Sequence, residues 1–373
     1  MNSIQGTRRL GLLATAVLAI VLATVSLAAC GGKSGSSSPP TTANPTAGAP
    51  APTNPVDARK PINPNNAPVV GQLYPAASAF QTGIPVMDGN FADPFVLIIG
   101  TTAYAYATNI ANANIPVGEL NTTTQMGQFL GDALPTLPSW SKPGYVWAPS
   151  VYDRGDGTYV MFYDTIYGYP GHQCISAATS TNPAGPFVDN SSAPLVCPLD
   201  LGGAIDASMI KVNGTPYVIY KSDGNCCSLP TTIFSQQLNS DLLSVTGSPT
   251  ALITNDQAWE ADVVEGPEMI QVGSQLWLFY SANDWNTANY GVGYAKCASI
   301  TGPCTKPTSS ALFTSTPDAV GTGGQTFIVL GTKAGMAYHG WMPGQVNTST
   351  GERRLYTGTI DFSSGVPVLV AYK

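Results

Sequence analysis

One phrase occurs five times along this 373-residue sequence at nearly constant spacing. Each copy contains an apolar run, a turn and a second apolar run that ends on a tyrosine. These anchor tyrosines are Tyr106, Tyr163, Tyr220, Tyr280 and Tyr338, and successive ones are 57, 57, 60 and 58 residues apart. A fixed period of this length, with a β-hairpin in every unit, is typical of sheets arranged radially around an axis. The sequence therefore predicts an all-β fold, a five-bladed β-propeller over residues 66–373.

The repeat also carries acidic residues at equivalent positions. Counting back from the anchor tyrosine to the start of the first run reaches Asp93 after 13 residues, Asp206 after 14 and Glu265 after 15. The matching positions of the other two units hold Pro149 and Gly324. Asp and Glu make up only 22 of 373 residues, so three acids in five equivalent positions exceed what chance provides. Because the first strand of every blade lines the central channel, we expect the three carboxylates to share one pocket.

The composition excludes one class of partner. Charged residues make up 10% of the chain, the net charge is −7, and the sequence contains no run of Lys or Arg. Proteins that bind nucleic acid present basic patches, so nucleic acid is not expected as a partner. We expect a monomer.

The N-terminal residues have the pattern of an address. Arg8 and Arg9 precede the apolar run 10–29, which ends Leu-Ala-Ala before Cys30. This pattern resembles a bacterial lipoprotein signal, which implies removal of residues 1–29 and attachment of lipid to Cys30. An uncleaved membrane anchor is the alternative, because the run is almost long enough to span a bilayer.

Residues 30–65 consist mainly of Gly, Ser, Thr, Pro and Ala. Such a composition buries too little apolar surface to offset the entropy of ordering, so it predicts a disordered tether. The expected protein is exported and held at the bacterial membrane by its lipid alone, with the propeller outside the cytoplasm.

Six cysteines follow Cys30, and an even number in an exported chain favours disulfides. The repeat favours Cys174 with Cys197 and Cys297 with Cys304, because each pair closes a loop within one blade. The adjacent Cys226 and Cys227 are left either as a vicinal bond or as thiols. A zinc site is not expected, because no CxxC pair occurs.

Four short motifs at the strand starts resemble glycoside hydrolase family 43. They are Phe91-Ala-Asp-Pro, Trp147-Ala-Pro-Ser-Val, Ile205-Asp-Ala-Ser and Glu265-Gly-Pro-Glu-Met, and the resemblance extends from about residue 90 to the C-terminus. It implies a five-bladed propeller and the activity of an arabinanase, α-L-arabinofuranosidase or β-xylosidase that inverts the anomeric carbon, with a polysaccharide or oligosaccharide as the binding partner. By this resemblance Asp93 is the general base, Glu265 the general acid and Asp206 the residue that tunes the acid.

Elementary chemistry agrees with these roles. Inverting hydrolysis needs one carboxylate that activates water and a protonated carboxyl group on the other face of the sugar. Three negative charges in one pocket repel, so at least one proton is retained near neutral pH. Asp206 close to Glu265 would raise the proton affinity that an acid catalyst needs. For any one of these acids alone, an ordinary turn or capping residue is the alternative.

Three aromatic residues and one histidine complete the predicted site. Phe91, Trp147 and Trp285 are predicted to bind the sugar, with core packing or coverage of the outer surface as the alternative for the tryptophans. His339 follows the anchor tyrosine of the fifth unit. In the resembling family such a histidine approaches a calcium or sodium ion in the channel, partly through water, whereas a hydrogen-bonded structural histidine is the alternative. No cofactor is expected for the chemistry itself.

Two other functions fit the same pattern less well. A glycan-binding propeller without activity would not need three acids. A fructan-type five-bladed hydrolase, which retains configuration, has an Asn-Asp-Pro phrase where this chain has Ala92-Asp93-Pro94, and an Arg-Asp-Pro phrase that this chain lacks. The pentose linkage and the choice between endo and exo action stay open.

Overall fold

The computed structural model describes residues 73–75, 87, 89–121, 126–168 and 171–370. The predicted signal, the lipidation site Cys30 and the tether 30–65 lie outside the described residues and stay predictions. Within the described ranges the structure is made of strands and three short 3-10 helices. No helix in these ranges is long and apolar enough to cross a membrane.

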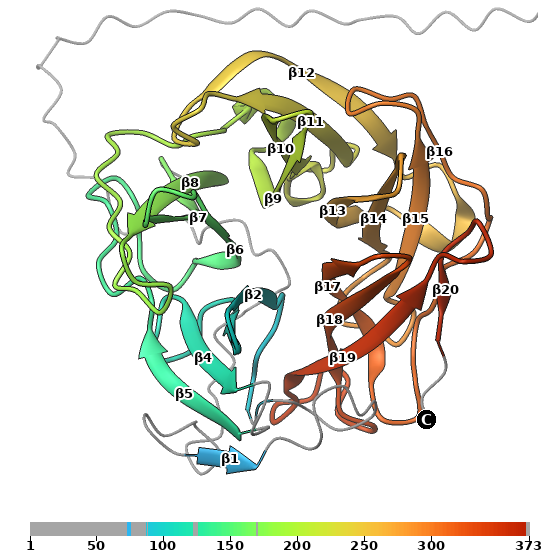
Figure 1. Cartoon of the computed structure of the whole chain (residues 1–373), viewed down its shortest axis with the longest axis horizontal. Helices are drawn as coiled ribbons and strands as arrows, with labels where there is room; N and C mark the ends of the chain where they lie inside the picture. The colour runs from blue at the N-terminus through green and yellow to red at the C-terminus, as the bar shows by residue number, and fades with distance from the viewer. Residues whose placement is uncertain (1–72, 76–86, 88, 122–125, 169–170, 371–373) are drawn as a thin grey trace, which may run out of the picture. The chain divides into compact units, whose positions relative to one another are not determined.

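The strands form five antiparallel sheets, each built from one stretch of the chain (Figure 1). Blade one contains β1 (Leu73–Pro75), β2 (Phe95–Ile99), β3 (Thr102–Tyr106), β4 (Pro116–Asn121) and β5 (Met126–Asp132). Blade two contains β6 (Trp147–Asp153), β7 (Tyr159–Tyr167) and β8 (His172–Ser180). Blade three contains β9 (Ala204–Val212), β10 (Thr215–Ser222), β11 (Thr232–Leu238) and β12 (Val245–Thr254).

The last two blades have four strands each. Blade four contains β13 (Val264–Val272), β14 (Gln275–Ala282), β15 (Gly291–Cys297) and β16 (Cys304–Thr305). Blade five contains β17 (Val320–Leu330), β18 (Lys333–Trp341), β19 (Arg353–Asp361) and β20 (Val368–Leu369). The 3-10 helices are η1 (Leu199–Leu201), η2 (Gly224–Cys227) and η3 (Ala258–Glu260).

The first long strand of every blade lies innermost, and these strands contact one another around a closed ring (Figure 1). The ring runs from β2 to β6, β9, β13 and β17 and returns to β2. This arrangement confirms the predicted five-bladed β-propeller and sets the starts of five strands around one axis.

The core of the propeller lies between the blades rather than within one of them. Five hydrophobic clusters each join residues of two neighbouring blades. The five anchor tyrosines are buried in these clusters, which explains why the sequence repeats them. Because apolar burial is the main force that favours folding, the period marks the residues that hold adjacent blades together.

The ring closes where blade five meets blade one. The backbone N–H of Phe91 donates to the carbonyl oxygen of Arg353 at 2.7 Å, and the N–H of Arg353 donates to Asn90 Oδ1 at 3.1 Å. The Phe91 ring is 1% exposed and packs in the cluster that contains Ala337 and Leu355. The substrate-binding role predicted for Phe91 is therefore corrected, because its side chain belongs to this closing seam.

Three disulfides are present in the structure. Cys174 is bonded to Cys197 and Cys297 to Cys304, which are the two pairs favoured by the sequence. Cys226 and Cys227, whose state the sequence left open, are bonded to each other.

Candidate active site

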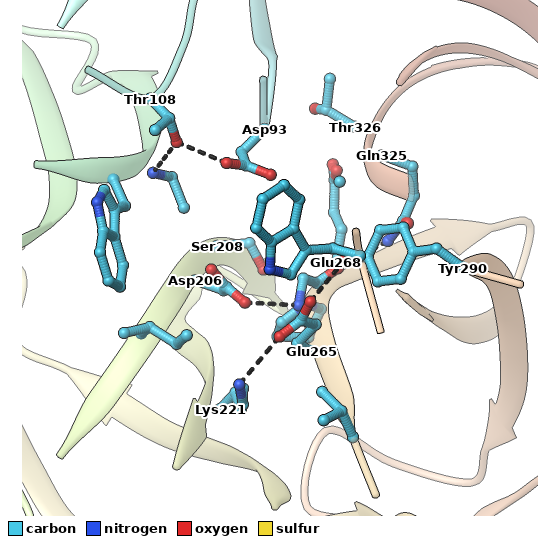
Figure 2. A pocket seen from close by; sticks show the side chains of 18 of the residues that line it. Asp93, Thr108, Asp206, Ser208, Lys221, Glu265, Glu268, Tyr290, Gln325 and Thr326 are labelled. Atoms are coloured by element: carbon cyan, nitrogen blue, oxygen red, sulfur yellow. Dashed lines mark hydrogen bonds and ion pairs between the residues drawn. The ribbon is translucent and has the colours of Figure 1, made fainter. Parts of the chain in front are cut away.

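A cavity of about 440 Å³ lies at the start of the innermost strands and is lined by residues of all five blades. Asp93, Asp206 and Glu265 all line it, although they come from blades one, three and four (Figure 2). The cavity has the volume of a small-molecule site. The sequence prediction that the three acids share one pocket agrees with this arrangement.

The backbone adopts the same uncommon conformation at the start of each innermost strand. Five residues there have positive φ, namely Asp93 at 50°, Ala148 at 42°, Asp206 at 61°, Gly266 at 53° and Gly324 at 57°. A positive φ is costly for residues other than glycine and persists where the surrounding structure holds it. The five strand starts are thus equivalent in conformation.

This equivalence refines the positions read from the repeat. In blade two the equivalent residue is Ala148 rather than Pro149, and in blade four it is Gly266. Glu265 lies one residue before its blade's equivalent position, whereas the two aspartates occupy theirs. The Glu265 side chain therefore leaves the backbone one position earlier than the two aspartate side chains do.

Asp93 is held in the charged form by its neighbours. Thr108 Oγ1 donates to Asp93 Oδ2 at 2.6 Å, and Arg353 Nη1 lies 3.3 Å from Asp93 Oδ1. Burial raises the pKa of Asp93, but the charge of Arg353 and the hydrogen bonds outweigh it and hold this pKa well below its usual range. Asp93 is accordingly a carboxylate that can accept a proton.

Asp206 is in the opposite state. Its Oδ2 accepts the backbone N–H of Gly266 at 2.8 Å, which places its carboxyl group beside β13, the strand that carries Glu265 (Figure 2). Burial and the charge of Glu265 raise the pKa of Asp206 to about 7. Asp206 is therefore partly protonated near neutral pH.

Glu265 is held by two donors. Tyr290 Oη donates to Glu265 Oε1 at 2.8 Å, and Lys221 Nζ donates to Oε2 at 3.0 Å. Lys221 is fully buried, which opposes its charge, but Glu265 and Asp223 raise the pKa of its ammonium group above the usual value. Both donors stabilise the carboxylate form of the Glu265 side chain.

Of the predicted aromatic residues, Trp147 and Trp285 line the cavity and Phe91 does not. The guanidinium carbon of Arg353 lies 4.3 Å from the centre of the Trp285 ring, and that ring is stacked with Trp341 at a centroid distance of 5.7 Å. Trp285 thus packs against the arginine that stabilises the Asp93 carboxylate, and it also borders the cavity. A cation over an indole face is favourable.

His339 does not fit direct binding of an ion through its free nitrogen. Its Nδ1 accepts the backbone N–H of Asp93 at 3.0 Å, and burial lowers the pKa of the imidazole, so the neutral ring carries its proton on Nε2. Nε2 is buried without a partner. A protonated nitrogen offers no lone pair, so His339 would face a calcium or sodium ion only through water. Its position matches the structural alternative.

The sequence assigned no role to Lys221, Glu268 and Arg353, which also line the cavity. Lys221 follows an anchor tyrosine, and Glu268 belongs to the fourth motif, so both carried a usable signal. Glu268 Oε2 accepts the backbone N–H of Phe327 at 3.1 Å, and burial raises the pKa of Glu268 to about 8. Arg353 carried no signal, because it occurs once and contacts Asp93 across 260 residues.

Comparison with known proteins places this geometry among carbohydrate-active enzymes. Residues 82–367 match the sequence model of glycosyl hydrolases family 43. A β-D-galactofuranosidase of Aspergillus niger is 26% identical over 271 residues, which cover 67% of this chain and 73% of that protein. A probable arabinan endo-1,5-α-L-arabinosidase A of Aspergillus fumigatus is 26% identical over 64% of this chain and 78% of its own length.

Solved structures of glycoside hydrolases are also similar to this chain. A thermostable family-43 glycoside hydrolase superimposes with a TM-score of 0.67 and 25% identity, over 82% of this chain and 96% of that one. An α-L-arabinofuranosidase from Lactobacillus brevis has a TM-score of 0.63 and 18% identity, over 76% of this chain and 95% of that one, which shows a shared fold.

Proposed function

Because this chain belongs to glycosyl hydrolase family 43, and is thus a glycoside hydrolase, we propose that it cleaves arabinofuranosyl or xylosyl linkages in polysaccharide with inversion. We assign Asp93 as general base, Glu265 as general acid and Asp206 as the residue that tunes the acid. The pentose specificity is supported by the arabinan-degrading relatives and by the resemblance of the motifs.

One observation carries the proposal, namely that carboxyl groups whose pKa values are shifted in opposite directions line one cavity. Arg353 holds the pKa of Asp93 well below its usual range, and burial raises the pKa of Asp206 to about 7. A site that only bound sugar would not need a proton acceptor and a proton donor together. A carboxylate base and a protonated carboxyl group in one site are what inversion requires.

The proposed reaction is a single displacement. Asp93 takes a proton from a water molecule while the oxygen of that water molecule bonds to the anomeric carbon. The bond from that carbon to the glycosidic oxygen breaks, and Glu265 gives this leaving oxygen a proton. Lys221 and Tyr290 then stabilise the Glu265 carboxylate, so they lower the cost of proton donation in the transition state.

The test compares two variants on two kinds of substrate. Glu265→Gln is expected to lower kcat on arabino- or xylo-oligosaccharides at least ~100-fold, the scale of a lost general acid. Its loss on nitrophenyl pentosides is expected to be much smaller, because nitrophenolate leaves without protonation. Asp93→Asn is expected to lose activity on both kinds of substrate, because each requires an activated water.

The panel includes α-L-arabinofuranosides, β-D-xylosides and β-D-galactofuranosides, and proton NMR follows the anomer formed first. Glu119→Gln, on β4 outside the cavity lining, is the matched control and is expected to keep wild-type rates. Near-normal activity of Asp93→Asn or of Glu265→Gln on oligosaccharides would show that the roles are misassigned. A product of retained configuration would exclude inversion.

A further inference from the structure

Each of the five equivalent strand starts has its backbone N–H bound by a side chain of the preceding blade. His339 Nδ1 accepts from Asp93 at 3.0 Å, and Thr108 Oγ1 accepts from Ala148 at 3.0 Å. Ser281 Oγ accepts from Gly324 at 2.9 Å.

Asp164 does the same for Asp206. Its Oδ1 and Oδ2 lie 3.1 and 3.0 Å from the Asp206 nitrogen. Three of these acceptors directly follow an anchor tyrosine and Thr108 follows one by two residues, so the supports repeat with the blades.

Blade four departs from this repeat, because the side chain that supports its strand start does not follow an anchor tyrosine. Blade four is also the blade that carries Glu265. The residue after the anchor tyrosine of blade three is Lys221, an ammonium group that cannot accept a hydrogen bond. Lys221 instead donates to Glu265, and the Asp206 carboxylate takes the backbone N–H of Gly266 at 2.8 Å. Asp206 therefore serves both as a residue of the site and as the support of the strand that carries Glu265.

We propose that Asp164 is a positioning residue that sets the geometry of Asp206 and Glu265 through two successive hydrogen bonds. Asp164 fixes the Asp206 backbone in its positive-φ conformation, and Asp206 in turn fixes Gly266 next to Glu265. Asp164 lies on β7, is fully buried and does not line the cavity, so it touches no substrate. This inference rests on the proposed function, because it takes Glu265 as the general acid and Asp206 as the residue that tunes it.

Two variants of Asp164 distinguish the loss of the hydrogen-bond acceptor from the loss of the carboxyl group alone. Asp164→Ala removes the acceptor and is expected to lower kcat on oligosaccharides at least ~10-fold with KM little changed, because small displacements of catalytic groups are costly. Asp164→Asn keeps one amide oxygen as acceptor and is expected to recover most of the lost kcat.

The pH profile supplies a readout that general destabilisation would not move. The hydrogen bond from Gly266 lowers the pKa of Asp206, so loosening this bond raises that pKa. The basic limb of kcat in Asp164→Ala is expected to move to higher pH by about half a unit, the size of one weakened hydrogen bond.

Asp189→Ala is the matched control. Asp189 is another buried carboxylate next to blade two, and it accepts hydrogen bonds from Tyr163 and Ser176 away from the cavity. Both alanine variants are expected to melt earlier, and activities are compared per folded protein, measured by circular dichroism. If Asp164→Ala matches Asp189→Ala in kcat and in pH profile, Asp164 has no positioning role.

The same outcome for Asp164→Asn and Asp164→Ala would also contradict the proposal. Failure of the proposed function is recognised separately, since Asp93→Asn and Glu265→Gln would then keep activity on oligosaccharides.

Discussion

At the scale of single residues, Arg353 favours the charged form of Asp93, the proposed base. Burial alone would favour the neutral carboxyl group, and only the neighbouring guanidinium and hydrogen bonds reverse this preference. The charge state of the proposed base therefore depends on a residue that takes no part in bond making in the proposed reaction.

Replacing Arg353 by Met is expected to move the acidic limb of kcat/KM to higher pH. Methionine keeps packing against Trp285 but lacks the charge that lowers the pKa of Asp93, so burial then raises this pKa. Activity should fall more at about pH 5 than at about pH 7, because the base must be ionised to work. Rates on nitrophenyl pentosides over this range measure the effect.

Arg354→Met is the control for the loss of a positive charge. Arg354 pairs with the Glu352 side chain at 3.0 Å and does not line the cavity. Its profile should keep the wild-type acidic limb. An unchanged limb in Arg353→Met would show that Arg353 does not set the charge of Asp93.

The residues recovered from the sequence are those that the repeat marks. Asp93 and Asp206 occupy equivalent strand starts and Glu265 lies one residue before one, so counting along the chain brought them together. Arg353 could not be found in this way, because it has no counterpart in other blades. Phe91 was misassigned, because a motif places a residue along the chain without showing which way its side chain points.

At the scale of elements, the start of each innermost strand is the irregular part of a regular blade. The pairing of β6 with β7, β9 with β10, β13 with β14 and β17 with β18 shifts register near the cavity. An extra residue at a bulge re-aims the side chains beside it. The unequal distances of 13, 14 and 15 residues from acid to tyrosine reflect this irregularity, which a count from the sequence cannot place to the residue.

The disulfides act on the same scale, and their effects should differ. Replacing Cys174 and Cys197 by alanine is expected to lower the free energy of unfolding by about 3 kcal/mol, because the bond closes a separation of 23 residues. Replacing Cys297 and Cys304, which are 7 residues apart, is expected to cost about 2 kcal/mol. Denaturant unfolding of the two double variants measures both values, and the reverse order would show that loop entropy does not dominate.

At the scale of the whole molecule, the blades are held together by five similar interfaces, and one of them joins the two ends of the repeat. That interface contains Phe91 and adjoins the pairing of Arg353 with Asp93. The number of blades and their order followed from the sequence, because they depend on a period. The closing contacts did not, because they join segments that occur once.

Phe91→Ala is expected to reduce both stability and activity. Removing a buried phenylalanine costs about 3–5 kcal/mol, and here it also loosens the backbone bond between Phe91 and Arg353. Phe187→Ala, in the cluster between blades one and two, is the control of equal size and burial. At equal folded fraction, Phe91→Ala should have the lower kcat, whereas equal rates would show that the seam does not influence the site.

The contact between Arg353 and Asp93 also has a consequence for the order in which the protein is made. Asp93 is synthesised with the first blade, but Arg353, whose guanidinium stabilises the Asp93 carboxylate, follows 260 residues later. A growing chain that has completed four blades already contains Asp93, Asp206 and Glu265, but it lacks His339 and Arg353, which both contact Asp93. The surroundings of Asp93 are therefore complete only when the fifth blade has been translated and has docked against the first.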